Sequence, residues 1–418
     1  MDLVASPPPP DIWAMPGFRD FMISMILVTL ANQVQGTVVA YQIYELTHDP
    51  LSLGAVGLAE ALPFIALALV GGHIADARDR RRISLHVLLV MMAMSALLYG
   101  CTRERAFLGA GWHKLAIYAV TVVLGACRSF LQPARAALNA ELLPQALYAR
   151  AITIRTGLFQ FAMITGPAGG GLLYSALGPK GAYLCSGVLL VVSWLAMYRI
   201  PKVRKKAEAK PSQSVARSIR EGFSYLASDR LLLAALLLDL FSVLFAGATA
   251  LLPVFANEIL AVGSRGFGLL RAAPAIGALA GSLVLASRPL KKAGPALMYA
   301  SVVFGLSTIA FGLSRSFWLS IALLFVGGVA DMISIVVRST LLQLRVPGHL
   351  LGRVASINQI FIGSSNEIGA FESGVAARLM GVVPSVVFGG VMTLLVTSVA
   401  AFRAPELRTL GRLDQASK

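Results

Sequence analysis

The sequence predicts an all-α integral membrane protein with twelve transmembrane helices in two pseudo-symmetric bundles of six. Three observations predict it. The chain is 57% hydrophobic and only 13% charged, whereas a soluble domain carries about 25% charged residues. Long apolar runs recur with short polar joints from residue 21 to residue 402. The longest polar interval, residues 201–230, divides those runs into two equal sets.

The apolar runs are long enough to cross a hydrocarbon core of about 30 Å, which takes roughly 20 helical residues. Unpaired backbone groups are costly in lipid, so spanning segments are helices or closed barrels, and continuous apolarity favours helices. The helices are expected at residues 20–45, 51–75, 83–101, 115–138, 150–176, 181–200, 231–256, 266–286, 296–314, 317–342, 354–379 and 383–402.

The expected organisation follows from these spans. Residues 1–18 form an N-terminal tail without the basic segment or cleavage site of a signal peptide. Residues 19–200 form the first bundle, 201–230 a linker, 231–402 the second bundle and 403–418 a C-terminal tail.

The basic residues indicate how the chain is oriented. Its formal net charge is +16, and Lys and Arg concentrate in alternate short loops, notably 76–82 and 199–230, as the positive-inside rule requires. The group Arg103, Arg105 and Lys114 is the exception. This distribution differs from the basic patch of a nucleic-acid-binding domain. We therefore expect a multi-pass protein of the cell inner (cytoplasmic) membrane, with tails and linker in the cytosol and no nucleic acid as partner.

The two halves also resemble each other in sequence. When the second half is moved back by 203 positions, Arg338 falls on Arg135, Pro347 on Pro144 and Gly374 on Gly171. Parallel six-helix repeats related by an axis along the membrane normal are an architecture of secondary transporters.

A charged stretch follows the second apolar run. Gly72-His-Ile-Ala-Asp76-Ala-Arg78-Asp79-Arg80-Arg81 resembles G-x-x-x-D-[RK]-x-G-R-[RK], the signature between helices 2 and 3 of the major facilitator superfamily, although Ala77 and Asp79 depart from it. The resemblance implies that Gly72, Asp76, Arg80 and Arg81 form a latch of the outward-open state. A mere orientation signal would explain the arginines alone.

A second motif lies in the fifth run. Ala162-Met-Ile-Thr-Gly166-Pro167-Ala-Gly169-Gly170-Gly171 resembles the G-x-x-x-G-P-x-x-G-G motif of drug–proton antiporters, with Ala162 in place of the first glycine. The resemblance implies an exporter in which Gly166, Pro167, Gly170 and Gly171 form the motif. The alternative is ordinary helix packing through small residues.

Longer stretches narrow the resemblance further. YQIYELTHDPLSLGAVGLAEALPF, RSFLQPARAAL, LLRAAPAIGALAG and SSNEIGAFESG are similar to the branch of the enterobactin exporter and the macrolide and drug–proton antiporters. This similarity covers nearly the whole chain, but no motif in it reports the cargo.

Charges within apolar spans are candidates for mechanism because an ionised side chain in the bilayer is costly unless it is paired or hydrated. The proton-coupling candidates are Asp239 and Asp331 first, then Glu60, Glu367 and Glu372. The alternative is that these charges form permanent ion pairs. The alignment of the two halves matches Arg128 with Asp331 and Glu60 with Arg271, so these are the expected pairs.

Other polar residues are candidates for cargo binding or gating. Arg128, Asn32, Gln33 and Gln35 could line a substrate cavity, although polar residues also hold membrane helices together. Arg135 and Arg338, repeat equivalents near cytoplasmic helix ends, are expected to close an inner gate.

The sequence contains no P-loop, nucleophile elbow, HExxH motif or zinc-spaced cysteines, so no enzyme, cofactor or metal site is expected. The expected function is secondary active export of an amphipathic small molecule, a siderophore being favoured, by alternating access with proton antiport. A macrolide or multidrug exporter, a lipid flippase and a non-transporting scaffold are the alternatives. The expected partners are the small-molecule cargo, protons and the lipid bilayer, with a monomer as the working unit.

Overall fold

The structure is a computed structural model that describes residues 12–103, 110–144, 147–201, 215–245, 247–287 and 292–411. Helices and short turns make up the described residues, and no strand occurs among them. Ten of the helical segments are long and apolar enough to cross a membrane. The expected class, an all-α multi-pass membrane protein, is confirmed.

The first half contains five long helices. They are α1 (Phe18–Thr47), α2 (Pro50–Ala77), α3 (Arg80–Arg103), α4 (Ala110–Leu142) and α5 (Tyr148–Arg199), preceded by the short η1 (Ile12–Ala14). The side chain of Asp49 caps α2 by accepting a hydrogen bond from Leu51 N at 3.1 Å. Helix α5 is interrupted at Gly178, whose φ of 67° lies in the region that favours glycine. The expected spans 150–176 and 181–200 therefore follow one another across this kink.

The second half follows the same plan with one irregular helix. Its elements are α6 (Val215–Ser228), α7 (Arg230–Phe245), η3 (Gly247–Leu251), α8 (Leu252–Val254), η4 (Phe255–Ile259), α9 (Gly263–Ser287), α10 (Ala293–Leu313), α11 (Phe317–Arg345), α12 (Gly348–Met380), α13 (Val382–Arg403) and α14 (Pro405–Thr409). The span expected at 231–256 is broken into a 3₁₀ turn, a short α-helical turn and a π turn. Pro253 contributes to this break because it has no backbone N–H to continue the ladder.

The number of twelve spans stays a prediction. Helix α5 is counted once among the ten candidates although the kink divides it. Helix α12 is not among the ten, and it carries the charged residues Arg353, Glu367, Glu372 and Arg378.

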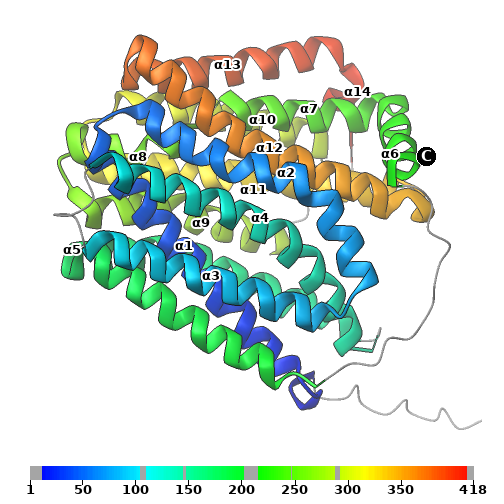
Figure 1. The fold of residues 1–418 in the computed structure, drawn as a ribbon. Coiled ribbons are helices and arrows are strands. Elements are labelled where there is room, and N and C mark those ends of the chain that lie inside the picture. The colour runs from blue at the N-terminus through cyan, green and yellow to red at the C-terminus, as the bar shows by residue number, and fades with distance from the viewer. Residues whose placement is uncertain are drawn as a thin grey trace, which may run out of the picture.

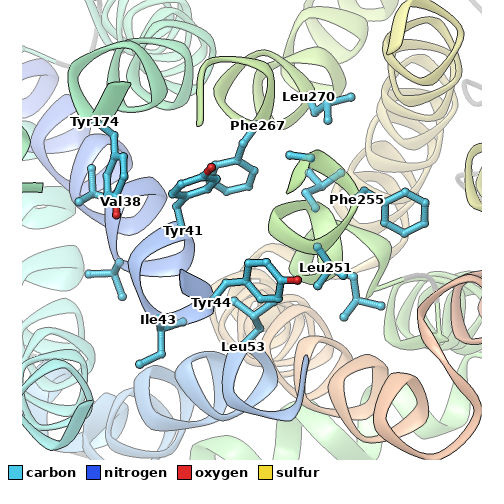
Figure 2. Packing of buried hydrophobic residues seen from close by; sticks show 14 of the residues in the cluster. Val38, Tyr41, Ile43, Tyr44, Leu53, Tyr174, Leu251, Phe255, Phe267 and Leu270 are labelled. Atoms are coloured by element: carbon cyan, nitrogen blue, oxygen red, sulfur yellow. The ribbon is translucent and has the colours of Figure 1, made fainter. Parts of the chain in front are cut away.

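The two halves pack together at one end of the molecule. Contacts of α2 with α12 and of α5 with α9 join them. One buried cluster contains residues of both halves, including Tyr41, Tyr44 and Leu53 from the first and Phe255 and Phe267 from the second (Figure 2). We call this the joined end.

At the opposite end the two halves have separate cores. The cluster around Phe18, Leu138 and Ile200 lies within the first half, and the cluster around Leu231, Leu341 and Leu407 lies within the second. Figure 1 shows the two sets of helices meeting on the left and diverging toward α6 on the right. We call this diverging end the basic end, because the arginine-bearing joints between α2 and α3 and between α11 and α12 lie there.

Candidate functional site

A cluster of charges connects the two halves between these ends. Arg128 of α4 donates to Glu60 of α2 at 2.5 Å and to Glu367 of α12, in the other half, at 3.4 Å. Arg271 of α9 donates to the backbone oxygen of Gly36 in α1 at 3.2 Å and interacts electrostatically with both glutamates. We call Glu60, Arg128, Arg271 and Glu367 the inter-bundle cluster. It contains two cations and two anions, so its charges balance.

Small residues hold the cluster together. A Cβ on Gly125 would lie 2.2 Å from the backbone oxygen of Glu60, so α4 and α2 are in backbone contact there. A Cβ on Gly57 would lie 3.1 Å from Ala370 Cβ and 3.3 Å from the backbone oxygen of Glu367. Helix α2 is thereby held between α4 and α12, as close packing through small residues permits. This position brings Glu60 and Glu367 to the same arginine.

The cluster is polar and partly accessible. The side chains of Arg128, Glu60 and Glu367 are 32%, 31% and 22% exposed, so the protein does not fully enclose them. The Arg128 guanidinium carbon lies 5.1 Å from the centroid of the Phe64 ring, a cation–π distance. The site therefore offers ionised groups beside an aromatic face.

Of the two ion pairs expected from the repeat, Arg128 with Asp331 is wrong, whereas Arg271 and Glu60 interact electrostatically without a hydrogen bond between them among the described residues. Arg128 binds two glutamates rather than Asp331, and Arg271 bonds to Gly36 rather than directly to Glu60. Asp331 is half-buried and makes no hydrogen bond or ion pair in the part of the chain that the structure describes. The alignment of the halves relates Arg128 of α4 to an equivalent position on α11, not to a spatial neighbour. The nearer partners of Arg128 come from α2 and α12.

Asp239 and Arg338 form a separate ion pair within the second half. Their side chains are only 8% and 5% exposed, and Ser334 Oγ also donates to Asp239 Oδ1 at 3.1 Å. A first-choice proton-coupling candidate and a gate candidate thus neutralise each other inside one bundle.

Breaking this pair is expected to destabilise the second bundle. Either Asp239→Asn or Arg338→Gln should lower the free energy of unfolding by about 3–5 kcal/mol because a buried charge loses its partner. Replacing both residues by apolar ones, Asp239→Leu with Arg338→Met, should recover most of that loss. Unfolding of the purified protein in detergent measures all three variants. A double variant as unstable as the single ones would show that the pair is not the cause.

The polar residues of α1 mostly face their own half. Gln33 donates to the sulfur of Met163, and Gln35 accepts a hydrogen bond from Ser186 at 3.2 Å; both partners are on α5. Asn32 is half-buried and makes no hydrogen bond with the described residues. Glu372 accepts from the neighbouring Ser373 at 3.4 Å, outside the cluster.

The glycine motif of α5 makes two kinds of contact. Gly166 and Gly170 lie against α1, where added Cβ atoms would be 2.4 Å from Gln33 Cβ and 3.1 Å from the backbone oxygen of Val34. Gly171 faces the other half, where a Cβ would lie 2.4 Å from the oxygen of Ser264 and 2.9 Å from Gly268 Cα. Pro167, one helical turn earlier, lies on the same side, since a Cβ on Gly268 would be 2.7 Å from its carbonyl oxygen. One motif therefore serves packing within the bundle and contact between the bundles.

Further contacts close the joined end. A Cβ on Gly374 would lie 3.1 Å from Gly54 Cα, which repeats the glycine contact between α5 and α9 on the other side of the molecule. Two tyrosines of α1 also reach across. Tyr41 Oη donates to Asn257 Oδ1 at 2.6 Å, and Tyr44 donates to Glu258. The sequence interpretation missed these bonds; the spacing of Tyr41 and Tyr44, three residues apart on one helix face, was the available signal.

The charged stretch at the basic end bonds only within the first half, as far as its described side chains show. Arg80 bonds to Glu141 of α4, and Arg81 donates to the backbone oxygen of Tyr198 in α5. The Asp76 side chain lies outside the described residues. A Cβ on Gly72 would meet nothing within 4 Å, whereas one on Gly71 would lie 2.1 Å from the oxygen of Ser129, so the close helix contact in this stretch is at Gly71.

Two helical bundles that meet at a charged, partly accessible cluster define a class of protein, the secondary transporters of the major facilitator type. Residues 13–418 match the family described as "Transmembrane secretion effector". The chain belongs to this family of transporters, which are not enzymes. No group of three or more His, Cys, Asp or Glu that could hold a metal ion occurs among the described residues.

Individual relatives agree with this assignment. The chain is 26% identical over 373 residues to the "Uncharacterized MFS-type transporter YkuC" of Bacillus subtilis (strain 168), with 82% of each protein covered. It is 25% identical over 407 residues to the "Enterobactin exporter EntS" of Citrobacter koseri, covering 93% of this chain and 94% of that one.

Solved structures show the same fold. A point mutant of the nucleoside transporter NupG matches with a TM-score of 0.73 at 12% identity, covering 93% of this chain and all of that one. A bacterial homologue of the iron transporter ferroportin in an inward-facing state matches with a TM-score of 0.72 at 14% identity, covering 94% and 98%.

Proposed function

We propose that this protein exports an amphipathic small molecule of the siderophore class across the inner membrane by alternating access, in exchange for protons. The observation that carries the proposal is Arg128, which is shared between Glu60 of its own half and Glu367 of the other half. The enterobactin exporters among the relatives support the cargo class. One chain contains all four cluster residues, so a monomer suffices.

The basic end is proposed to face the cytosol, together with both tails and the linker, because of the positive-inside rule. The conformation is then inward-facing, since the joined end is packed and the basic end is divided into two cores. Arg80 and Arg81 bonding within their own half fits a cytosolic latch that is open in this state.

Competition for one carboxylate would couple protons to cargo. The hydroxyl groups of a catechol donate hydrogen bonds, and an ionised carboxylate accepts them more strongly than a neutral carboxyl group does. A proton on Glu367 or Glu60 weakens that acceptor and turns one carboxyl oxygen into a donor, and bound cargo in turn hinders protonation. The empty, ionised cluster holds Arg128 to Glu367 across the halves, so the halves rearrange only when a proton or cargo replaces this contact. These are the requirements of an antiporter.

Transport into everted membrane vesicles tests the proposal. With a proton gradient that is acidic inside the vesicle, a catecholate siderophore should accumulate in vesicles that contain the protein, and a protonophore should abolish accumulation. Vesicles without the protein provide the background. A macrolide tested in parallel separates the siderophore exporter from the drug exporter. Accumulation that is unaffected by the protonophore would contradict proton antiport.

A further inference from the structure

Helix α4 carries a stripe of polar residues from the basic end to the inter-bundle cluster. The stripe consists of Asn139, Arg135, Gln132 and Arg128. The other three residues lie four, seven and eleven positions after Arg128, so all four are on one face of the α-helix. The rise of 1.5 Å per residue places Arg135 about 10 Å from Arg128 along the helix axis. Gln132, between them, is exposed.

Arg135 differs from Arg128 in having no anionic partner among the residues that the structure describes. Its only hydrogen bond among the described residues is a long one, 3.4 Å, to the backbone oxygen of Ser24 in α1. Its Nε atom is buried without a partner. An ionised guanidinium that is partly desolvated and unpaired is costly, so this position favours binding of an anion.

The equivalent stripe in the second half is different. The repeat places Asp331, Ile335, Arg338 and Leu342 of α11 at these four positions. There the arginine is neutralised by Asp239, and two of the polar positions are apolar. The unpaired cation is therefore a property of the first half, not a requirement of the shared fold.

From these observations we infer that Arg135 binds an acidic group of the cargo, while the cargo's hydroxyl groups reach the inter-bundle cluster. This inference rests on the proposed function and specifies its substrate class as a hydroxylated aromatic molecule that also carries a carboxylate. Arg128 is satisfied by two glutamates, so the acidic group binds the unpaired arginine instead. The axial separation of about 10 Å between the two arginines sets the distance between the two recognised groups.

Binding of two matched probes to the purified full-length protein tests the inference. The probes are dihydroxybenzoylserine, which is anionic, and its neutral methyl ester. Wild type is expected to bind the acid about tenfold more tightly than the ester, a difference of about 1.4 kcal/mol. Arg135→Gln should remove this preference and leave ester binding unchanged, whereas Arg135→Lys should keep part of it.

Two further variants keep the test decisive. Arg150→Gln removes an exposed cation near the same end of the molecule and should keep the full preference. Gln132→Leu should weaken binding of the acid a few-fold, and it tests the stripe independently if Arg135→Gln does not fold.

The thermal midpoint of the ligand-free Arg135→Gln protein should equal or exceed that of wild type, because no buried anion loses its partner.

A preference for the acid that survives in Arg135→Gln would overturn the inference, as would equal binding of acid and ester by wild type. Stabilisation of wild type by sulfate to the same extent as by the acid would also contradict it, because the site would then bind any small anion. Failure of the inference is distinguishable from failure of the proposed function. In the former case the ester is still exported in the vesicle assay, and in the latter no catechol compound accumulates.

Discussion

Glu367→Gln is expected to reduce proton-driven export by more than about tenfold, the effect of losing a hydrogen bond between charged groups worth roughly 1.5–3 kcal/mol. The substitution keeps the shape of the side chain but removes the charge that Arg128 binds across the halves at 3.4 Å. It also removes one group that can carry a proton. Uptake of cargo into everted vesicles, with and without a proton gradient, measures the effect.

Exchange of labelled for unlabelled cargo separates coupling from binding. This exchange needs no net proton movement, so Glu367→Gln should retain it. Glu372→Gln is the matched control, because Glu372 lies five residues further along α12 and, among the described residues, accepts a bond from Ser373 alone. A Glu367→Gln protein that accumulates cargo against its gradient as fast as wild type would exclude Glu367 from coupling.

Gly171→Val is expected to prevent closure of the joined end and so to abolish export. A Cβ at this position would lie 2.4 Å from the oxygen of Ser264 and 2.9 Å from Gly268 Cα, both backbone atoms of the other half that cannot move aside independently. Gly169→Val, two residues earlier, is the control, because a Cβ there would meet nothing within 4 Å.

Labelling of a single cysteine reports the state of the joined end. Leu53 is 5% exposed in the cluster shared by the two halves, so Leu53→Cys in a background without the three native cysteines should resist a membrane-impermeant maleimide. Gly171→Val should make this cysteine reactive, while Gly169→Val should not. Protection that is unchanged by Gly171→Val would show that α5 and α9 need not approach this closely.

The sequence was sufficient to predict the fold class because the bilayer imposes length and apolarity on each spanning segment. The break in the second half after Phe245 was not predictable in the same way. The run that ends at Val254 is mostly apolar, and Pro253 within it indicates only a local interruption. The irregular backbone also depends on contacts such as that of Gly247 with the backbone of Gly369 in α12.

The composition of the site was predictable, but its pairing was not. A charge inside a span marks Glu60, Arg128 and Glu367 as candidates, and the structure brings all three together. Which charges meet depends on helix neighbours, and the repeat relates equivalent helices rather than adjacent ones. The sequence places Asp239 before Glu367 among the proton-coupling candidates. The pairing of Asp239 with Arg338 inside one bundle is a tertiary contact, and the sequence pattern does not predict it.

Distances between spin labels test most directly whether the Arg128–Glu367 contact controls the movement of the two halves. One pair of labels, at Leu177 and Trp318, reports the joined end, and another, at Arg78 and Leu344, reports the basic end; all four sites are exposed. Acidification of the wild-type protein should add a population with a longer distance at the joined end and a shorter one at the basic end. Glu367→Gln should show no such dependence on pH. Distances that lengthen at both ends or shorten at both ends, or an unchanged pH response in Glu367→Gln, would contradict control of alternating access by this contact.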